Sequence, residues 1–417
     1  MMNQTEINTQ VKEAKTKFAA MVGAYFFGVF NDNYYKQAAM LIAVTAGLSQ
    51  LQGTATVLFS LPFVLFSAYG GWLADRFPKK RVIISAKTLE LIACIFGAIG
   101  LILQNWNAVL AMIFIMGLQA TIFAPALNAS IPELFPESHV TKANAILKLM
   151  TTLAILFGLA TAGISLDQNW MSTSIPFGII LVSVVVVGVA LLGLICSLWI
   201  FFSPSKNPGL HFPKKGPWQS LVDIYELRSR PDLLISVFSS TFFYSVSTLA
   251  VLTINTLGLK QFAFSQTSTS LMSVALMVGV CIGAFIAGKI SSVKNWFHLL
   301  PLSAGVMGFG LILMGASPYI PEDVRLASLF IILAVIGIAG GILIIPVTTY
   351  LQVKPQSHEK GKIIGIVNFS DFIGIIIAGE FYILLDHFFL PNQSMIVLAA
   401  LALTYAAITT QVIKRFK

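Results

Sequence analysis

Long apolar runs alternate with short polar stretches along this chain. Runs of roughly 20 residues, the length that a helix needs to cross a bilayer, occur at 18–45, 51–74, 82–103, 107–131, 143–166 and 175–202. Six more follow a proline-rich, basic segment, at 233–258, 267–290, 297–317, 325–351, 362–386 and 393–413. The pattern predicts an all-α polytopic membrane protein with 12 transmembrane helices. We expect an N-terminal six-helix bundle (1–202), a cytoplasmic linker (203–232) and a C-terminal six-helix bundle (233–417).

Composition separates this chain from soluble proteins. Of its 417 residues, 57% are hydrophobic and 10% are charged, and the mean hydropathy is +0.85; an ordinary soluble domain is about 25% charged. The net charge of +9 lies in short basic clusters between apolar runs, so we expect no nucleic-acid partner. The three cysteines lie singly in apolar stretches, which indicates neither a disulfide framework nor a metal site. No cofactor is expected.

The basic residues also predict an orientation. With the N-terminus placed in the cytoplasm, 21 of the 26 lysines and arginines fall on that side, and only Lys260 and Arg325 fall on the other. Positive charge collects in cytoplasmic loops, so both termini are expected inside the cell. The polar first seventeen residues show no cleavable signal peptide, and we expect the first span to act as its own insertion signal.

Seven ionisable residues interrupt the predicted spans. At roughly 3 kcal/mol each on insertion scales they cost on the order of 20 kcal/mol, more than a structural role alone explains, and such residues commonly mark a transport pathway. Their signs nearly balance, which suits a zwitterionic ligand better than a simple anion. They are three lysines (Lys36, Lys87, Lys148) and four acids (Asp32, Glu90, Asp371, Glu380).

Two of these residues lie in "FFGVFNDNYYKQAAM" (26–40), near the middle of the first span. Asp32 and Lys36 are four residues apart, so one helical face carries both of them, together with Tyr25 and Gly28. Two interpretations stay open. The pair forms a self-contained structural salt bridge, or it belongs to a polar wall that faces a water-filled cavity.

The loop "GGWLADRFPKKRVII" (70–84) resembles the loop signature of the major facilitator superfamily, although Pro78 replaces its usual glycine. We expect Gly71 to let two helices approach closely, and Asp75 to pair with a cation or to cap a helix N-terminus. The alternative is an ordinary basic loop with one acid. In the first interpretation six residues form a conformational gate: Gly71, Asp75, Arg76, Lys79, Lys80 and Arg81.

Residues 26–40 further resemble the first span of bacterial lysophospholipid transporters, and most closely the transporter modules that are fused to acyltransferases. The likeness continues through "ADRFPKKRVIISAKTLEL", which includes Lys87 and Glu90, and "PALNASIPELFPESHVTKANAILKLMTTLAILFG", so it covers most of the first half. Two departures stand out. The lysine that the family has shortly after Pro125 is missing, and Lys148 stands where the family tends to carry glutamate.

The resemblance implies a transporter, not an enzyme, that moves lysophospholipids such as lysophosphatidylethanolamine across the inner membrane by alternating access. A functional link to a cytoplasmic acyltransferase would follow, although no acyltransferase domain is fused here, and we expect a monomer. Asp32 is the expected partner of the ammonium group, and Lys36, Lys87 or Lys148 that of the phosphate. The whole expected binding set is Asn31, Asp32, Asn33, Lys36, Lys87, Glu90, Lys148, Asn368 and Asp371.

Two other functions stay open. A proton-coupled exporter of drugs or siderophore-like amphiphiles would use the same fold, with Asp32, Asp371 or Glu380 as a proton relay. A non-transporting membrane receptor or assembly partner would show no flux, and the charges in the middle of the spans count against it.

Overall fold

A computed structural model describes residues 4–170, 175–201, 204–205, 207–214, 216–290, 296–356 and 359–416. These residues form helices joined by short connections, and no strand occurs among them. The chain divides by its internal contacts into two units. The first unit comprises Met1–Ala39 and Leu58–Pro217, and the second comprises Met40–Val57 and Trp218–Lys417.

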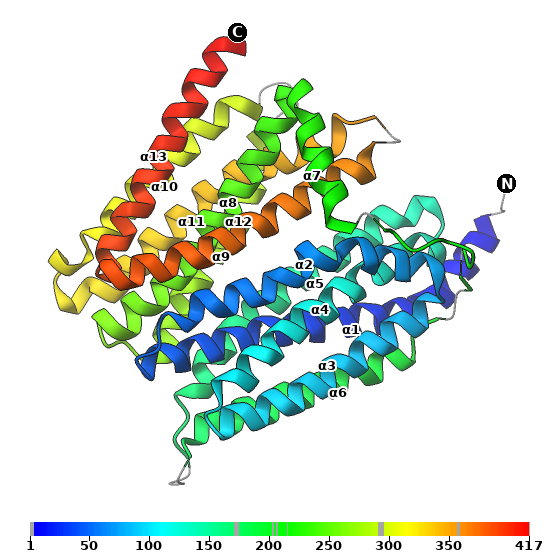
Figure 1. The fold of residues 1–417 in the computed structure, drawn as a ribbon, viewed down its shortest axis with the longest axis horizontal. Coiled ribbons are helices and arrows are strands. Elements are labelled where there is room, and N and C mark those ends of the chain that lie inside the picture. The colour runs from blue at the N-terminus through cyan, green and yellow to red at the C-terminus, as the bar shows by residue number, and fades with distance from the viewer. Residues whose placement is uncertain are drawn as a thin grey trace. The chain divides into compact units, whose positions relative to one another are not determined.

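Six long helices build the first unit, and they run side by side (Figure 1). They are α1 (Gln4–Thr45), α2 (Leu51–Arg76), α3 (Lys79–Ile102), α4 (Trp106–Leu134), α5 (Glu137–Leu166) and α6 (Phe177–Leu198). The prolines Pro78, Pro136 and Pro176 directly precede α3, α5 and α6, where the lack of an amide hydrogen costs no helical bond. Asn105 caps α4 by accepting a hydrogen bond from the Ala108 amide. Helix α3 packs against α4 and α6.

The second unit begins with the short α7 (Gly216–Glu226), whose first two residues belong to the first unit. Its long helices are α8 (Pro231–Thr256), α9 (Gln266–Ile290), α10 (Leu299–Gly315), α11 (Glu322–Val353), α12 (Lys360–Phe388) and α13 (Pro391–Phe416). A turn of π-helix, Leu257–Gln261, extends α8. Small residues let α9 and α11 cross closely: a Cβ atom on Gly279 or Gly337 would overlap the backbone of the other helix.

The boundary between the two units passes through α1 and through α2. Met40–Val57, which contains the end of α1 and the start of α2, has its contacts in the second unit. There Gln52 donates a hydrogen bond to the Tyr382 hydroxyl (2.7 Å) and accepts one from Asn255 (2.8 Å). Pro62 lies inside α2, shortly after the chain returns to the first unit at Leu58.

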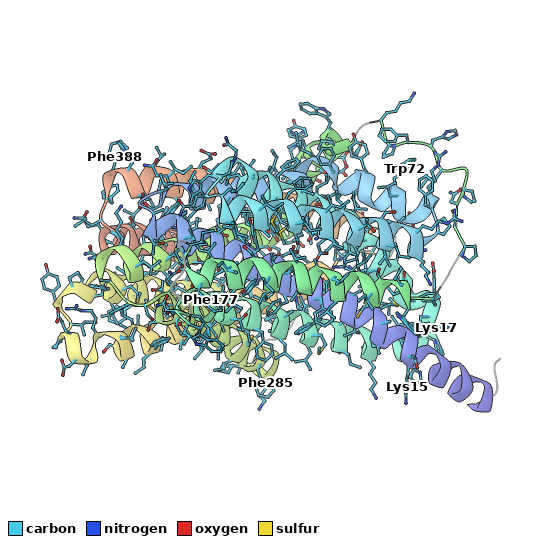
Figure 2. The ribbon with its side chains drawn as sticks, turned by 90° about the horizontal axis from the view of Figure 1, so that it is seen from below. Lys15, Lys17, Trp72, Phe177, Phe285 and Phe388 are labelled. Atoms are coloured by element: carbon cyan, nitrogen blue, oxygen red, sulfur yellow. The ribbon has the colours of Figure 1, made fainter. Side chains whose placement is uncertain are left out.

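The prediction of an all-α protein with twelve long helices is confirmed. Of the described helices, ten are long and apolar enough by themselves to cross a membrane; α1 is not among them because polar residues interrupt its apolar run, and α10 is short. Large apolar side chains such as Phe285 and Phe388 project outward (Figure 2), where a lipid-facing surface would hold them. The predicted linker contains α7, and Ser203, Lys206 and Lys215 lie outside the described residues.

Candidate functional site

A buried ion pair lies inside the first unit. The Lys87 ammonium is 2.6 Å from Glu90 Oε2, and both side chains, on neighbouring turns of α3, are buried almost completely. The same ammonium lies 4.5 Å from the centre of the Phe123 ring of α4, in the geometry of a cation–π contact. Lys87 therefore has a partner on either side before any ligand is considered.

A glycine of α1 makes room for Lys87. A Cβ atom on Gly28 of α1 would overlap the Lys87 ammonium nitrogen, and one on Gly193 of α6 would lie 3.7 Å from it. Tyr25, one turn before Gly28, stacks on Phe123 with the ring centres 6.0 Å apart. The face of α1 that contains Tyr25 and Gly28 is thus turned toward α3 and α4.

Asp32 continues that face. The carboxylate lies within the electrostatic range of Lys36, Lys87 and Glu90, and the side-chain amide of Gln119 in α4 lies near it. Two cations and two anions therefore share one region of the first unit, which we call the four-charge cluster (Asp32, Lys36, Lys87 and Glu90). Its formal charge is zero.

Among the described residues, neither Lys36 nor Asp32 forms an ion pair, whereas Lys87 and Glu90 pair with each other. The Lys36 ammonium lies 4.5 Å from the centre of the Phe59 ring of α2. Within the described residues, no ion pair joins it to Asp32. The structure thus contains no self-contained Asp32–Lys36 salt bridge, and Lys36 retains its hydrogen-bond donors.

The neighbouring asparagines differ from each other. Asn31 is buried and donates from its side chain to the Val186 carbonyl oxygen (3.0 Å) and to Cys94 Sγ (3.3 Å), so it ties α1 to α6 and α3. Asn33 donates to the Val29 carbonyl of its own helix (2.8 Å). Asn31 holds helices together, while Asn33 makes only a local bond.

Four buried oxygens in this region accept no hydrogen bond from the described residues: Asn31 Oδ1, Asp32 Oδ1, Glu90 Oε1 and Gln119 Oε1. Buried polar atoms are normally paired, because an unpaired one costs about 1–3 kcal/mol. All four are acceptors, so what the region lacks is hydrogen-bond donors. An ammonium group is such a donor.

In the second unit, Asp371 of α12 is buried. Its two oxygens accept hydrogen bonds from Ser240 (2.9 Å) and Thr241 (3.3 Å), both on α8. Neither partner is charged. Asp371 is thus a carboxyl group that hydroxyl groups hold in the interior of a helix bundle.

Three other predicted residues are exposed. Lys148 lies more than three turns into α5, and Asn368 and Glu380 lie on α12. Their side chains take no part in the buried contacts described above. The predicted binding set therefore divides between the four-charge cluster with Asn31 and Asn33 in the first unit, Asp371 in the second unit, and exposed positions.

The predicted gate lies at the end of α2 and the start of α3. A Cβ atom on Gly71 would meet no atom within 4 Å, whereas one on Gly70 would overlap the Thr121 carbonyl of α4. The close approach that we expected at Gly71 is therefore made by its neighbour. Lys79 is buried and pairs with Glu133 of α4 at 2.5 Å. Asp75 and Arg81 are exposed, and Lys80 is half-buried.

The described part of the linker is fastened to this end of α2. Arg76 and the Trp72 indole both donate to the Leu210 carbonyl oxygen, at 3.0 and 3.1 Å. The Ser205 hydroxyl donates to the Arg76 carbonyl at 2.7 Å, and the Asn207 amide donates to that of Asp75 at 3.2 Å. These bonds satisfy carbonyls that a helix end leaves unpaired.

Sequence reasoning missed Gln119, Phe59 and Phe123. All three lie in runs that are otherwise apolar, where phenylalanine is common and gives no signal. Gln119 was detectable in the sequence, because a side-chain amide in the middle of an apolar helix needs a hydrogen-bond partner. Among the described residues, no group of three histidine, cysteine, aspartate or glutamate side chains lies close enough to hold a metal ion.

The sequence is similar to a known protein family and to named transporters. The sequence pattern of the Major Facilitator Superfamily matches residues 17–379. The lysophospholipid transporter LplT of Klebsiella pneumoniae (strain 342) is 25% identical over 372 residues, which cover 87% of each chain. The same transporter of Escherichia coli O1:K1 / APEC is 23% identical over 362 residues, or 84% of each chain.

Solved structures agree on the fold. An inward-facing, unoccupied bacterial homologue of the human lysosomal transporter Spinster superimposes with a TM-score of 0.72 at 14% identity, over 95% of this chain and 96% of that one. A D-xylose–proton symporter gives a TM-score of 0.69 at 15% identity, over 97% of each chain. Together with the family match and the apolar helices, these likenesses show that the chain belongs to the major facilitator superfamily and is a multi-pass membrane transporter.

Proposed function

We propose that this transporter moves lysophospholipids with a zwitterionic head group, such as lysophosphatidylethanolamine, across the inner membrane by alternating access. The observation that carries the proposal is the four-charge cluster, in which an unpaired lysine lies near buried acceptor oxygens. The names of the relatives support the same substrate class.

In this proposal the ammonium group of the ligand donates to Asp32, whose Oδ1 atom has no other donor among the described residues. Lys36 binds the phosphate, because Lys87 already pairs with Glu90 and Lys148 is exposed. Lys87 and Glu90 then hold the shape of the site. Asn31, Asn33 and Asn368 remain proposed hydrogen-bond partners, and the loop signature remains a proposed gate.

The wider setting of the protein follows from the same proposal. Both termini would lie in the cytoplasm, as the distribution of basic residues predicts. A cytoplasmic acyltransferase would consume the delivered lysolipid, and this removal would drive net uptake by a monomer without a coupling ion.

Reconstitution with a panel of lysolipids that differ only in head group tests the proposal. Liposomes that contain the purified protein should take up lysophosphatidylethanolamine faster than protein-free liposomes, and collapse of the proton gradient should leave that rate unchanged. Uptake that is equal with and without protein would refute the proposal.

A proton-coupled exporter is the second candidate, and Asp371 favours it. A buried carboxyl group that only hydroxyls contact can exchange a proton during a transport cycle. In that case flux would depend on the pH gradient, and Asp371→Asn would abolish the dependence while lysolipid uptake stayed at the level of protein-free liposomes.

A further inference from the structure

Helix α7 carries an apolar face that nothing in the described structure covers. Trp218, Leu221, Val222 and Tyr225 have exposed fractions of 72%, 45%, 51% and 61%. Their spacing of three, four and seven residues places all four on one side of the helix. Tryptophan and tyrosine are the residues that gather where a membrane meets water.

The flank of α7 beside this apolar face is fastened to a membrane helix. Asp223 and Glu226 both pair with Lys362 of α12, at 3.0 and 2.8 Å, and Gln219 donates to Asp223 at 2.9 Å. Lys362 is the third residue of α12, so these bonds hold α7 level with the end of a membrane-spanning helix. The apolar face then points away from that helix.

The connection to α8 is also short. Only residues 227–230 separate α7 from Pro231, the first residue of α8. Even fully extended, four residues reach about 14 Å. Because α8 is itself apolar enough to cross a membrane, the end of α7 lies near the membrane surface. In Figure 1, α7 runs obliquely to α8 instead of continuing it.

A cation lies at one edge of the apolar face. Arg228 is exposed and lies 3.8 Å from the centre of the Tyr225 ring. The acids Asp223 and Glu226, on the flank of the helix beside this face, both pair with Lys362, which offsets part of their charge. The side of α7 that is open to contact therefore combines an apolar stripe with a cation at its edge, which suits an anionic lipid surface.

We propose that this face of α7 is a membrane-docking surface: Trp218, Leu221, Val222 and Tyr225 enter the headgroup region of the bilayer, and Arg228 binds anionic phospholipid head groups. The surface is separate from the four-charge cluster and does not depend on which substrate is transported. It fixes the start of the second unit at the membrane surface.

Site-directed spin labelling of the full-length protein tests this. Leu221→Cys places a nitroxide on the apolar face, and Gln219→Cys places a matched one on the polar face. Both are made in a background where Cys196 and Cys281 are serine; Cys94 is buried and does not react. The proteins are reconstituted in phosphatidylcholine vesicles with or without phosphatidylglycerol. Power saturation compares collisions with oxygen, which enters lipid, and with a water-soluble nickel chelate.

At position 221 we expect frequent oxygen collisions and few nickel collisions, and at position 219 the reverse. Phosphatidylglycerol should move label 221 deeper, and Arg228→Gln should remove that shift. Equal nickel access at both positions would place the face in water and overturn the proposal. Protection of position 221 from both reagents would show that protein covers it, which also overturns the proposal. A depth that is unaffected by phosphatidylglycerol would refute the anionic-lipid specificity.

Discussion

Lys87 and Glu90 form an ion pair of 2.6 Å that is buried in the core of the first unit, with Gly28 leaving space for the ammonium group. The desolvation of two such charges is costly, and their attraction offsets that cost only while both are present. The pair is therefore sensitive to the loss of one member. If Lys87 and Glu90 have a structural role, losing one of them lowers the stability of the protein. If they only contacted substrate, its loss would lower transport and leave stability unchanged.

Single substitutions of this pair should be more harmful than the double one. Lys87→Met or Glu90→Met alone leaves one buried charge without its partner, and we expect losses of about 3–5 kcal/mol in unfolding free energy. Lys87→Met combined with Glu90→Met should restore most of that loss. Thermal unfolding in detergent measures all three variants. Additive losses in the double variant would show that the two side chains do not stabilise each other.

Asp32→Asn should impair transport without unfolding the protein. The substitution keeps the size of the side chain but removes the charge that the ammonium group of a ligand would meet. Loss of one charged hydrogen bond, about 1.5–3 kcal/mol, lowers affinity for lysophosphatidylethanolamine roughly ten- to a hundredfold. Binding and uptake assays in liposomes measure the effect.

A substrate without an ammonium group provides the control for Asp32. Lysophosphatidylglycerol should lose less affinity than lysophosphatidylethanolamine in the same variant. Thr88→Ala, an exposed position on α3 whose hydroxyl bonds only its own helix, should leave both substrates unaffected. Equal losses for the two lysolipids would mean that Asp32 does not recognise the ammonium group.

Gly28→Ala and Gly71→Ala should have opposite effects on stability. A methyl group at position 28 overlaps the Lys87 ammonium, so the pair must shift, at a cost of about 1–3 kcal/mol. At position 71 no atom lies within 4 Å, and replacing a helical glycine with alanine gains about 0.5–1 kcal/mol. Melting temperatures of the two variants in the same detergent check the contrast, and a stabilised Gly28→Ala would contradict the described packing.

Trp72→Ala should loosen the described part of the linker. It removes the indole donor to Leu210 and an edge contact with Phe212, whose ring centre is 5.2 Å away. Amide hydrogen exchange of residues 207–214 should become faster, while exchange in α3 stays unchanged. Lys214→Gln, an exposed position in the same segment, is the control and should leave the exchange rates as they are.

The sequence predicted the helices better than the contacts of their charged residues. Apolar runs of span length need no tertiary information, so the twelve long helices could be predicted directly. The common face of Tyr25, Gly28 and Asp32 also followed from helical periodicity. Helix α7 was missed because proline and basic residues surround it and because 11 residues are too few to make a span.

The spacing of charged residues along a helix did not show which of them pair with each other. Lys36 is four residues from Asp32, yet its ammonium lies over Phe59 of another helix, while Lys87 pairs with Glu90 three residues away. Both arrangements satisfy helical geometry, and only the packing of neighbouring helices decides between them. In the same way, the adjacent glycines Gly70 and Gly71 look alike in the sequence, and the position of Thr121 on α4 determines which one is needed.

The proline in α2 has a mechanical consequence. Pro62 has no amide hydrogen, so the Leu58 carbonyl does not receive the bond that residue 62 would otherwise donate, and helices bend most easily at such a gap. Leu58 is also where α2 passes from the contacts of the second unit to those of the first. The helix is thus weakest where its two ends belong to different bodies, and this turn can serve as a pivot that lets one end swing while the other stays fixed.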